Sequence, residues 1–216
     1  MVQKLNLDKK TMRLYLVTDS AWVGELSLAE QVEQSLIGGA SFVQIREKNL
    51  DFDSFVKKAI KIKKVTDKYK IPFVVNDNIE VALKVDADGV HVGQSDLTAK
   101  NCRKILGNDK ILGVSAQTVV QALNAQENGA DYIGVGAVFS TNTKGDASEL
   151  DFETIKNICN AVSIPVVLIG GINENNINEL NGIKADGIAV ISAILASNNI
   201  KKTSEKLLDL SNQVFG

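Results

Sequence analysis

The chain has 216 residues, 44% of them hydrophobic, which is enough apolar material for a large core and close to the lower limit of length for one βα barrel. Its 24 Lys and Arg residues against 26 Asp and Glu residues give a formal net charge of −2, so it lacks the basic field that nucleic acid or an anionic membrane surface requires. We therefore expect small molecules as its partners, with no nucleic acid and no membrane.

The amino-terminal segment MVQKLNLDKKTMRLYLVTDS lacks the apolar run of a signal peptide, and no later stretch has the length of a membrane span, which predicts a cytoplasmic protein. Cys102 and Cys159 stand far apart without a CxxC pair or a clustered histidine, which predicts two reduced thiols. No Pro/Ser-rich linker interrupts the chain, so we expect a single domain over residues 1–216. Self-association into a homo-oligomer stays open at this point.

Short apolar runs rich in Val and Ile alternate with longer amphipathic stretches, as in βα units around a parallel sheet. Segments such as SFVKKAIKIKKVTDKY and FETIKNICNAV repeat apolar residues three and four positions apart, which predicts crossover helices. The predicted strands are residues 14–18, 42–46, 73–76, 89–92, 111–114, 132–135, 166–169 and 187–190.

A weak internal repeat favours a closed barrel. Ala-Ser or Ala-Asp stands before each even strand, in the segments GGASFVQI, DADGVHV, GADYIGV and KADGIAV. The odd strands also resemble one another, in the segments RLYLVTD, IPFVVND, KILGVSA and IPVVLIGG. Four related βαβα quarters indicate an α/β fold of the (β/α)8 TIM barrel type. The alternative, an open doubly wound sheet, would usually carry a GxGxxG turn after its first strand, where this chain has LYLVTDSAWVGE.

The residues that follow each strand are the candidates for function, because the active site of a βα barrel lies at the carboxyl ends of its strands. Gly170-Gly171 follow strand seven and Ile191-Ser192 follow strand eight, where barrels commonly bind a phosphate group. The alternative is that the glycines serve only turn geometry and that Ser192 only caps a helix. Their joint position favours phosphate binding.

Three basic residues would reach the same mouth from different loops: Arg46, Lys48 and Lys144. Surface Lys and Arg side chains are usually only solvated. Strand alternation, however, points Gln44 and Arg46 to the same side, opposite their apolar neighbours. The three cations would suit a second, more highly charged anion such as a diphosphate.

Two carboxylates, Asp77 after strand three and Asp96 after strand four, would face one another near that diphosphate. Magnesium is commonly held by one or two carboxylates with phosphate oxygens and water, so the pair predicts Mg2+, although each Asp could instead cap the next helix. The only histidine, His91, lies within strand four. We favour a barrel-lining role for it over catalysis, because no carboxylate or nucleophile neighbours it in sequence.

Several segments of the chain resemble the successive signatures of the thiamine phosphate synthase family. In chain order they are VQIREK, VNDN, ADGVHVGQSDL, GVSAQT, GADYIGVGAVFSTNTK, IPVVLIGGI and ADGIAVISAI. The resemblance extends from residue 14 to residue 194, and TNTK together with QIREK and the two Asp loops is its most specific part. It implies a (β/α)8 barrel. It also implies a transferase that joins a hydroxymethylpyrimidine diphosphate to a thiazole phosphate, with Mg2+, and so forms thiamine phosphate and diphosphate.

The resemblance also implies roles for individual residues. The residues expected to bind the pyrimidine diphosphate are Gln44, Arg46, Lys48, Asn76, Ser115 and Lys144. Of these, the ones expected to act in catalysis are Arg46, Lys48, Ser115 and Lys144. Asp77 and Asp96 would hold Mg2+. The thiazole substrate would contact Thr141 and Thr143, and its phosphate would lie on Gly171, Ile191 and Ser192.

Two departures from the family pattern bear on the alternatives. Ala137 and Ser140 replace the two prolines of the loop that often reads GPVFPT, and Gln117 stands where some relatives carry a histidine. A related thiazole tautomerase would need such an acid/base group and no diphosphate clamp, whereas a non-catalytic phosphate-ligand-binding barrel would be expected to lose clamp residues. Gln117 and a complete clamp favour the synthase.

Overall fold

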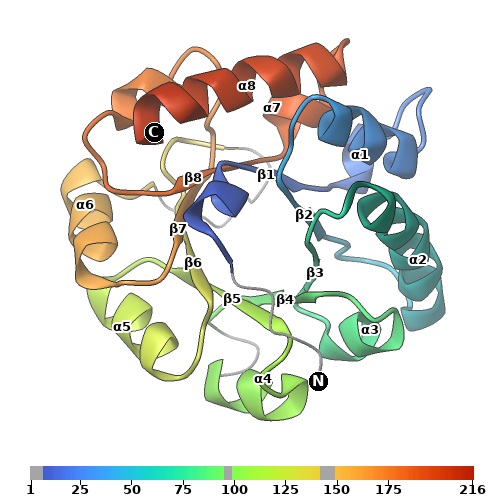
Figure 1. Ribbon diagram of the computed structural model, residues 1–216, viewed down its shortest axis with the longest axis horizontal. Coiled ribbons are helices and arrows are strands. Elements are labelled where there is room, and N and C mark those ends of the chain that lie inside the picture. The colour runs from blue at the N-terminus through green and yellow to red at the C-terminus, as the bar shows by residue number, and fades with distance from the viewer. Residues whose placement is uncertain (1–6, 95–98, 142–148) are drawn as a thin grey trace.

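Eight parallel strands close into a barrel in the computed structural model, which describes residues 7–94, 99–141 and 149–216 (Figure 1). Each strand pairs with the next in sequence, and the last pairs with the first. The predicted (β/α)8 barrel is therefore confirmed. The strands are β1 (Leu14–Val17), β2 (Phe42–Ile45), β3 (Phe73–Asn76), β4 (Gly89–Val92), β5 (Ile111–Ala116), β6 (Tyr132–Val135), β7 (Val166–Ile169) and β8 (Gly187–Val190).

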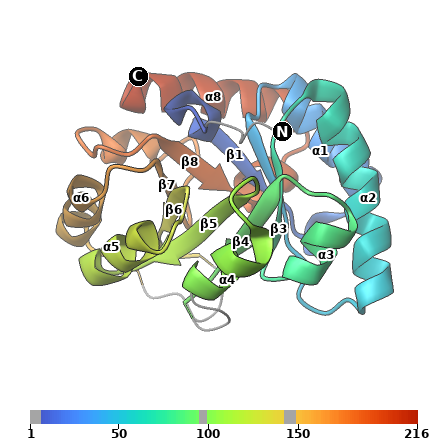
Figure 2. The same ribbon diagram turned by 60° about the horizontal axis from the view of Figure 1, so that its bottom comes forward.

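Helices form a ring around these strands (Figure 1). The α-helices are α1 (Leu28–Ile37), α2 (Phe52–Tyr69), α3 (Ile79–Lys84), α4 (Ala99–Leu106), α5 (Val119–Glu127), α6 (Phe152–Ala161), α7 (Ser192–Leu195) and α8 (Ile200–Phe215). The 3-10 helices are η1 (Lys9–Met12), η2 (Ser20–Trp22) and η3 (Ile177–Leu180), the last lying in the crossover from β7 to β8. The ring closes where α8 packs beside α1 (Figures 1 and 2). Within the described residues, no helix combines the length and apolar character needed to cross a membrane.

Strand alternation produces two apolar layers. Leu14 and Leu16 of β1 belong to the outer layer, between the strands and the helices, whereas Tyr15 and Val17 of the same strand point into the barrel. The interior layer consists of Met12, Tyr15, Val17, Phe42, Val74, Ile111, Tyr132, Val167 and Ala189. Side chains thus fill the barrel beneath its mouth, as expected for a closed eight-stranded sheet.

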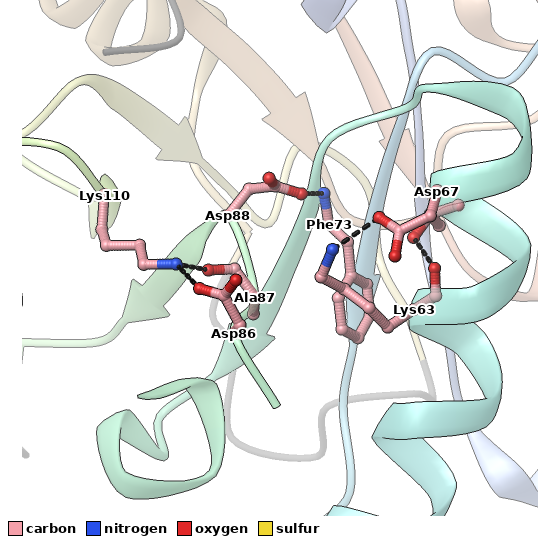
Figure 3. Close-up of polar contacts among 8 residues, drawn as sticks. Lys63, Asp67, Phe73, Asp86, Ala87, Asp88 and Lys110 are labelled. Carbon is pink, nitrogen blue, oxygen red and sulfur yellow. Dashed lines mark hydrogen bonds and ion pairs between the residues drawn. The ribbon is translucent and has the colours of Figure 1, made fainter. Parts of the chain in front are cut away.

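The internal repeat has a structural cause at the amino-terminal edge of the barrel. The polar residue before each even-numbered strand accepts a hydrogen bond from a backbone N–H of the preceding odd-numbered strand. That N–H belongs to the first or second residue of the odd-numbered strand. These bonds join Leu14 to Ser41 (3.1 Å), Phe73 to Asp88 (2.8 Å), Leu112 to Asp131 (2.9 Å) and Val166 to Asp186 (2.8 Å). Figure 3 shows the bond of Asp88, beside the Lys110 ammonium that contacts Asp86 and the Ala87 carbonyl. These repeated side chains therefore connect neighbouring strands along the amino-terminal edge of the barrel.

Three predicted strand ends need correction. Strands β1 and β2 end one residue earlier than expected, and β5 continues to Ala116 because Ser115 and Ala116 pair with Gly134 and Val135 of β6. Ser115 therefore lies within β5 rather than in the loop that follows it.

Candidate active site

Because all eight strands are parallel, their carboxyl ends lie at one edge of the barrel, and the predicted site residues that the structure describes gather there. Those that the structure describes are Gln44, Arg46, Lys48, Asn76, Asp77, Ser115, Thr141, Gly171, Ile191 and Ser192. Three predicted residues, Asp96, Thr143 and Lys144, lie outside the described residues.

Arg46 follows β2 and brings a nearly buried guanidinium to the mouth. Only 10% of its side chain is exposed, and its Nη1 lies 3.4 Å from Oδ2 of Asp19, which follows β1. Its backbone N–H donates to Oγ1 of the buried Thr18 over 3.2 Å. Its Nη2 is buried and has no hydrogen-bond partner in the described part of the chain. A buried donor without a partner is unfavourable, so this atom is placed to receive an acceptor from a ligand.

A cavity of about 390 Å³ opens beside Arg46, and Lys48 lines it. The wall of this cavity also includes Glu47. The Oε1 atom of Glu47 accepts a hydrogen bond from the Ser20 hydroxyl (2.5 Å) and forms an ion pair with Lys58 of α2 (2.9 Å). The Glu47 carboxylate is thereby neutralised next to the two cations of the loop. Sequence reasoning missed both Asp19 and Glu47; the signals were an Asp directly after the first strand and a Glu inside REK.

Asn76 ends β3 and donates from its Nδ2 to Oδ2 of Asp77 over 2.5 Å. Asp77 has a left-handed backbone (φ 59°), and its N–H donates to the carbonyl of His91 over 2.8 Å. The helix that follows is capped by Asn78, whose side chain accepts from the N–H of Val81, so Asp77 does not serve as the cap. Its exposed carboxylate lies at the mouth, while no group of three or more His, Cys, Asp or Glu side chains within the described residues could hold a metal.

A row of hydrogen bonds crosses the barrel interior below the mouth. It runs from Gln44 Nε2 to Tyr15 Oη (2.5 Å), to Tyr132 Oη (2.8 Å), to His91 Nδ1 (2.9 Å) and, from His91 Nε2, to Ser115 Oγ (2.9 Å). Burial raises the pKa of both tyrosines above its ordinary value, so both hydroxyls are neutral. His91 lines the barrel, as expected, but it also touches Ser115. Sequence reasoning missed Tyr15 and Tyr132, although alternation along their strands could have indicated that they point inward.

The turn after β7 is formed by Gly170 and Gly171, both at positive φ (107° and 66°). A Cβ atom on Gly171 would lie 2.6 Å from the carbonyl oxygen of Ser140 and 2.8 Å from Cβ of Phe139, so only glycine fits against the loop that follows β6. The carbonyl of Gly171 accepts from the side chains of Asn173 (3.1 Å) and Asn176 (2.9 Å). Turn geometry thus requires these glycines independently of any ligand.

The loop after β8 leads directly into α7. Ile191 is the N-cap residue and α7 begins at Ser192, with no side-chain capping hydrogen bond. The hydroxyl of Ser192 is therefore not used as a helix cap, and the first N–H groups of a helix have no carbonyl partner within it. Thr141 lies half-buried after β6, one residue beyond Ser140, which packs against Gly171. The loops after β6, β7 and β8 thus form one side of the mouth.

Fold and candidate site together define the class: a (β/α)8-barrel enzyme. Its candidate site, at the carboxyl ends of the strands, combines a buried guanidinium, an Asn-Asp pair and a glycine turn. The model of the family described as thiamine monophosphate synthase matches residues 14–194, and the chain belongs to this family.

Similar proteins cover almost the whole chain. The thiamine-phosphate synthase of Clostridium tetani is 52% identical over 200 residues, which is 93% of this chain and 96% of that protein. The thiamine-phosphate synthase of Ruminiclostridium cellulolyticum is 54% identical over 197 residues, 91% of this chain and 94% of that protein. The solved structure of thiamine phosphate pyrophosphorylase from Pyrococcus furiosus has a TM-score of 0.88 at 36% identity and covers 96% of this chain and 99% of that chain. The family resemblance of the sequence motifs is thereby confirmed.

Proposed function

We propose that this barrel is a thiamine phosphate synthase: it joins hydroxymethylpyrimidine diphosphate to thiazole phosphate and releases diphosphate. Relatives about half identical to it over more than nine tenths of its length carry that name. The family model, which spans residues 14–194 of the closed barrel, also supports one domain over residues 1–216.

The observation that carries the proposal is the unpartnered Nη2 of Arg46. Arginine presents a planar set of donors that matches phosphate oxygens, and a bidentate contact would satisfy this buried atom. Lys48 lines the cavity beside it and adds a second positive charge. The nearby Glu47 is already paired with Lys58, so it would not repel an entering diphosphate at full strength.

In the proposed reaction, the C–O bond between the pyrimidine methylene and the diphosphate breaks, and the thiazole nitrogen forms a C–N bond to that carbon. Negative charge grows on the leaving diphosphate, so cations aimed at it stabilise the transition state. We assign this role to Arg46, Lys48 and Lys144. The reaction needs positioning of two substrates rather than a strong protein base or nucleophile.

The remaining residues would position the two substrates. Gln44, Asn76 and Ser115 would hold the pyrimidine, and Ser115 would also contact the reacting region. The thiazole would contact Thr141 and Thr143, and its phosphate would lie on Gly171, Ile191 and Ser192. This assignment is supported by the shared edge of the barrel and by the Ser192 hydroxyl, which is not used as a helix cap.

Asp77 and Asp96 would hold Mg2+ in this proposal. The Asp77 carboxylate is exposed at the mouth and is not used for helix capping, which fits an oxygen ligand of a hard cation. When bound, the ion would neutralise charge on the diphosphate.

A tautomerase would need a proton-transferring side chain after β5. Gln117 stands there, with its backbone N–H bonded to Gln121 (2.7 Å) and its side-chain amide 3.3 Å from the Gly136 carbonyl. An amide does not exchange protons near neutral pH, which argues against that reaction.

The test is to incubate the purified chain with both substrates and Mg2+ and to measure thiamine phosphate and diphosphate together. We expect equal amounts of the two products, and neither when thiazole phosphate is left out. Absence of thiamine phosphate from the complete mixture would overturn the proposal.

A further inference from the structure

An ion pair in the wall of the cavity beside Arg46 takes no part in the substrate contacts proposed above. Lys58 belongs to α2, which packs outside β2 and β3, and Glu47 lies in the loop after β2 (Figure 1). The Nζ atom of Lys58 lies 2.9 Å from Oε1 of Glu47 and donates to Oγ of Ser20 over 2.7 Å. The Ser20 hydroxyl donates to the same Glu47 oxygen over 2.5 Å. The three groups therefore form a closed triangle of charge-assisted contacts.

The carboxylate of this triangle is shielded from water. The side chain of Glu47 is 6% exposed, and that of Lys58 is 30% exposed. A carboxylate removed from water needs a cation or hydrogen-bond donors beside it. Lys58 and Ser20 supply them, and no ion pair joins Glu47 to Arg46 or Lys48, its neighbours in the chain, among the described residues.

The wall of the cavity has a small positive charge. It carries three cations, Arg46, Lys48 and Lys58, and two carboxylates, Asp19 and Glu47, which leaves one net positive charge. Asp19 contacts Arg46 and Glu47 contacts Lys58, so each carboxylate of the wall has its own cation. The charge of Lys48 is the part of the wall that these pairs do not balance.

Removing one member of the pair changes this charge in opposite directions. Without the charge of Lys58, the poorly hydrated Glu47 carboxylate would take Arg46 or Lys48 as its partner. The wall would then have no net charge and one cation fewer for an anion. Without the charge of Glu47, Lys58 would be unpaired and the wall would carry two net positive charges.

We propose that Lys58 is a positioning residue that acts through Glu47. It occupies the carboxylate, leaves Arg46 and Lys48 to the diphosphate, and so sets how tightly the cavity holds that anion. Glu47 in turn limits the affinity, which favours release of diphosphate after the C–O bond breaks. The inference rests on the proposed function, because that function brings a diphosphate to Arg46 and Lys48.

Two single variants separate this role from a purely structural one. Lys58→Met and Glu47→Gln each remove one charge and nearly keep the size of the side chain. Calorimetry with inorganic diphosphate at a fixed Mg2+ concentration measures affinity without requiring turnover. We expect Lys58→Met to weaken diphosphate binding about fivefold and Glu47→Gln to strengthen it about fivefold, as for one unit charge in a hydrated site. An ion pair that only stabilised the loop would weaken binding in both variants.

The double variant Glu47→Gln/Lys58→Met restores one net positive charge to the wall. We expect it to bind diphosphate within about twofold of the wild type, and Lys58→Arg, which keeps the charge, to do the same. Lys68→Met is the matched control. Lys68 lies in the last turn of α2 and also pairs with a carboxylate, that of Glu33 (2.6 Å), but it is 64% exposed and should not affect diphosphate binding.

Steady-state kinetics gives a second readout. In each variant, KM for the pyrimidine diphosphate should change in the same direction as the dissociation constant of diphosphate, while KM for thiazole phosphate stays within about twofold. If Lys58→Met fails to fold in a thermal melt, Glu47→Gln decides alone, because Gln keeps an oxygen acceptor for Ser20 and Lys58. Diphosphate affinity that does not rise in Glu47→Gln contradicts the inference.

Weaker binding in both single variants, or a double variant as weak as Lys58→Met, would also overturn the inference and leave the synthase proposal intact. A wild-type protein that binds no diphosphate and makes no thiamine phosphate would overturn both.

Discussion

Arg46 shows how a single residue can be prepared for a ligand. Asp19 contacts Nη1 of the guanidinium, and Nη2 is buried without a hydrogen-bond partner among the described residues, so the side chain is oriented before any ligand arrives. Preorganised donors cost little reorganisation when charge develops on a leaving group. We therefore propose that the same residue serves both substrate binding and catalysis.

Replacing Arg46 by Lys should keep the charge and lose the planar pair of donors. We expect kcat/KM for the pyrimidine diphosphate to fall about 10- to 100-fold, the worth of one or two charge-assisted hydrogen bonds, with KM for thiazole phosphate little changed. Steady-state kinetics with each substrate varied in turn measures this. Arg103→Lys is the control, because Arg103 binds Asp131 and the Gly129 carbonyl at the other edge of the barrel and should affect stability alone.

The variant Asp77→Asn should raise the Mg2+ concentration needed for half-maximal rate by about tenfold or more, because it removes a charged oxygen ligand while keeping the shape. Asp86→Asn is a close control: Asp86 also has positive φ (51°), but it contacts Lys110 at the amino-terminal edge. Rates measured over a range of Mg2+ concentrations separate the two variants. Full wild-type activity in excess chelator would rule out the metal role.

At the scale of elements, the loops after β6 and β7 pack against each other. Gly171 can approach the loop after β6 only because it has no side chain, and the amides of Asn173 and Asn176 fix its carbonyl. The start of α7 lies after the neighbouring strand β8. One turn thus sets the shape of the surface on which we propose that the thiazole phosphate lies.

Ser192→Asp should weaken thiazole phosphate binding more than pyrimidine diphosphate binding, because it places a like charge at the first residue of α7. We expect KM for thiazole phosphate to rise at least about fivefold, from a repulsion on the order of 1 kcal/mol in a hydrated site. Ser192→Asn, similar in shape and neutral, is the control. Equal changes for both substrates would count against this position for the phosphate.

At the scale of the whole molecule, the two edges of the barrel have different tasks. Asp131 links the amino-terminal edge, since its Oδ2 accepts from the N–H of Leu112 (2.9 Å) and from Arg103 (2.7 Å). At the carboxyl edge, a cavity of about 390 Å³ opens beside Arg46, whose Nη2 has no hydrogen-bond partner among the described residues. We therefore propose that stability and ligand binding depend on opposite ends of the strands, as is usual in βα barrels.

Asp131→Ala should therefore lower the free energy of unfolding without affecting turnover. We expect a loss of about 2 to 4 kcal/mol, because the largely buried Arg103 loses its carboxylate partner and keeps only carbonyl acceptors, and the N–H of Leu112 loses its acceptor. Urea unfolding measures the loss, and kcat at a temperature where the variant is folded should stay within about twofold of wild type. A large fall in kcat would show that the edges are coupled.

The amino-acid sequence by itself determined the eight strands, the barrel and the family, because each depends on local periodicity or on motifs read along the chain. It also predicts that Gln44 and Arg46 point to the same side of the chain, since alternation is a local property of a strand. Ser115 was misplaced by the same local reasoning, because where β5 ends depends on its pairing with β6.

Only the tertiary structure decided how distant residues meet. Tyr15 and Tyr132 are far apart in sequence, and their hydroxyls meet only because the closed barrel sets which inward side chains share a layer. The ion pair of Glu47 with Lys58, the buried Nη2 of Arg46 and the approach of Gly171 to Ser140 follow from packing in the same way. Periodicity sets the direction in which a side chain points, whereas its partner depends on the register and closure of the whole sheet.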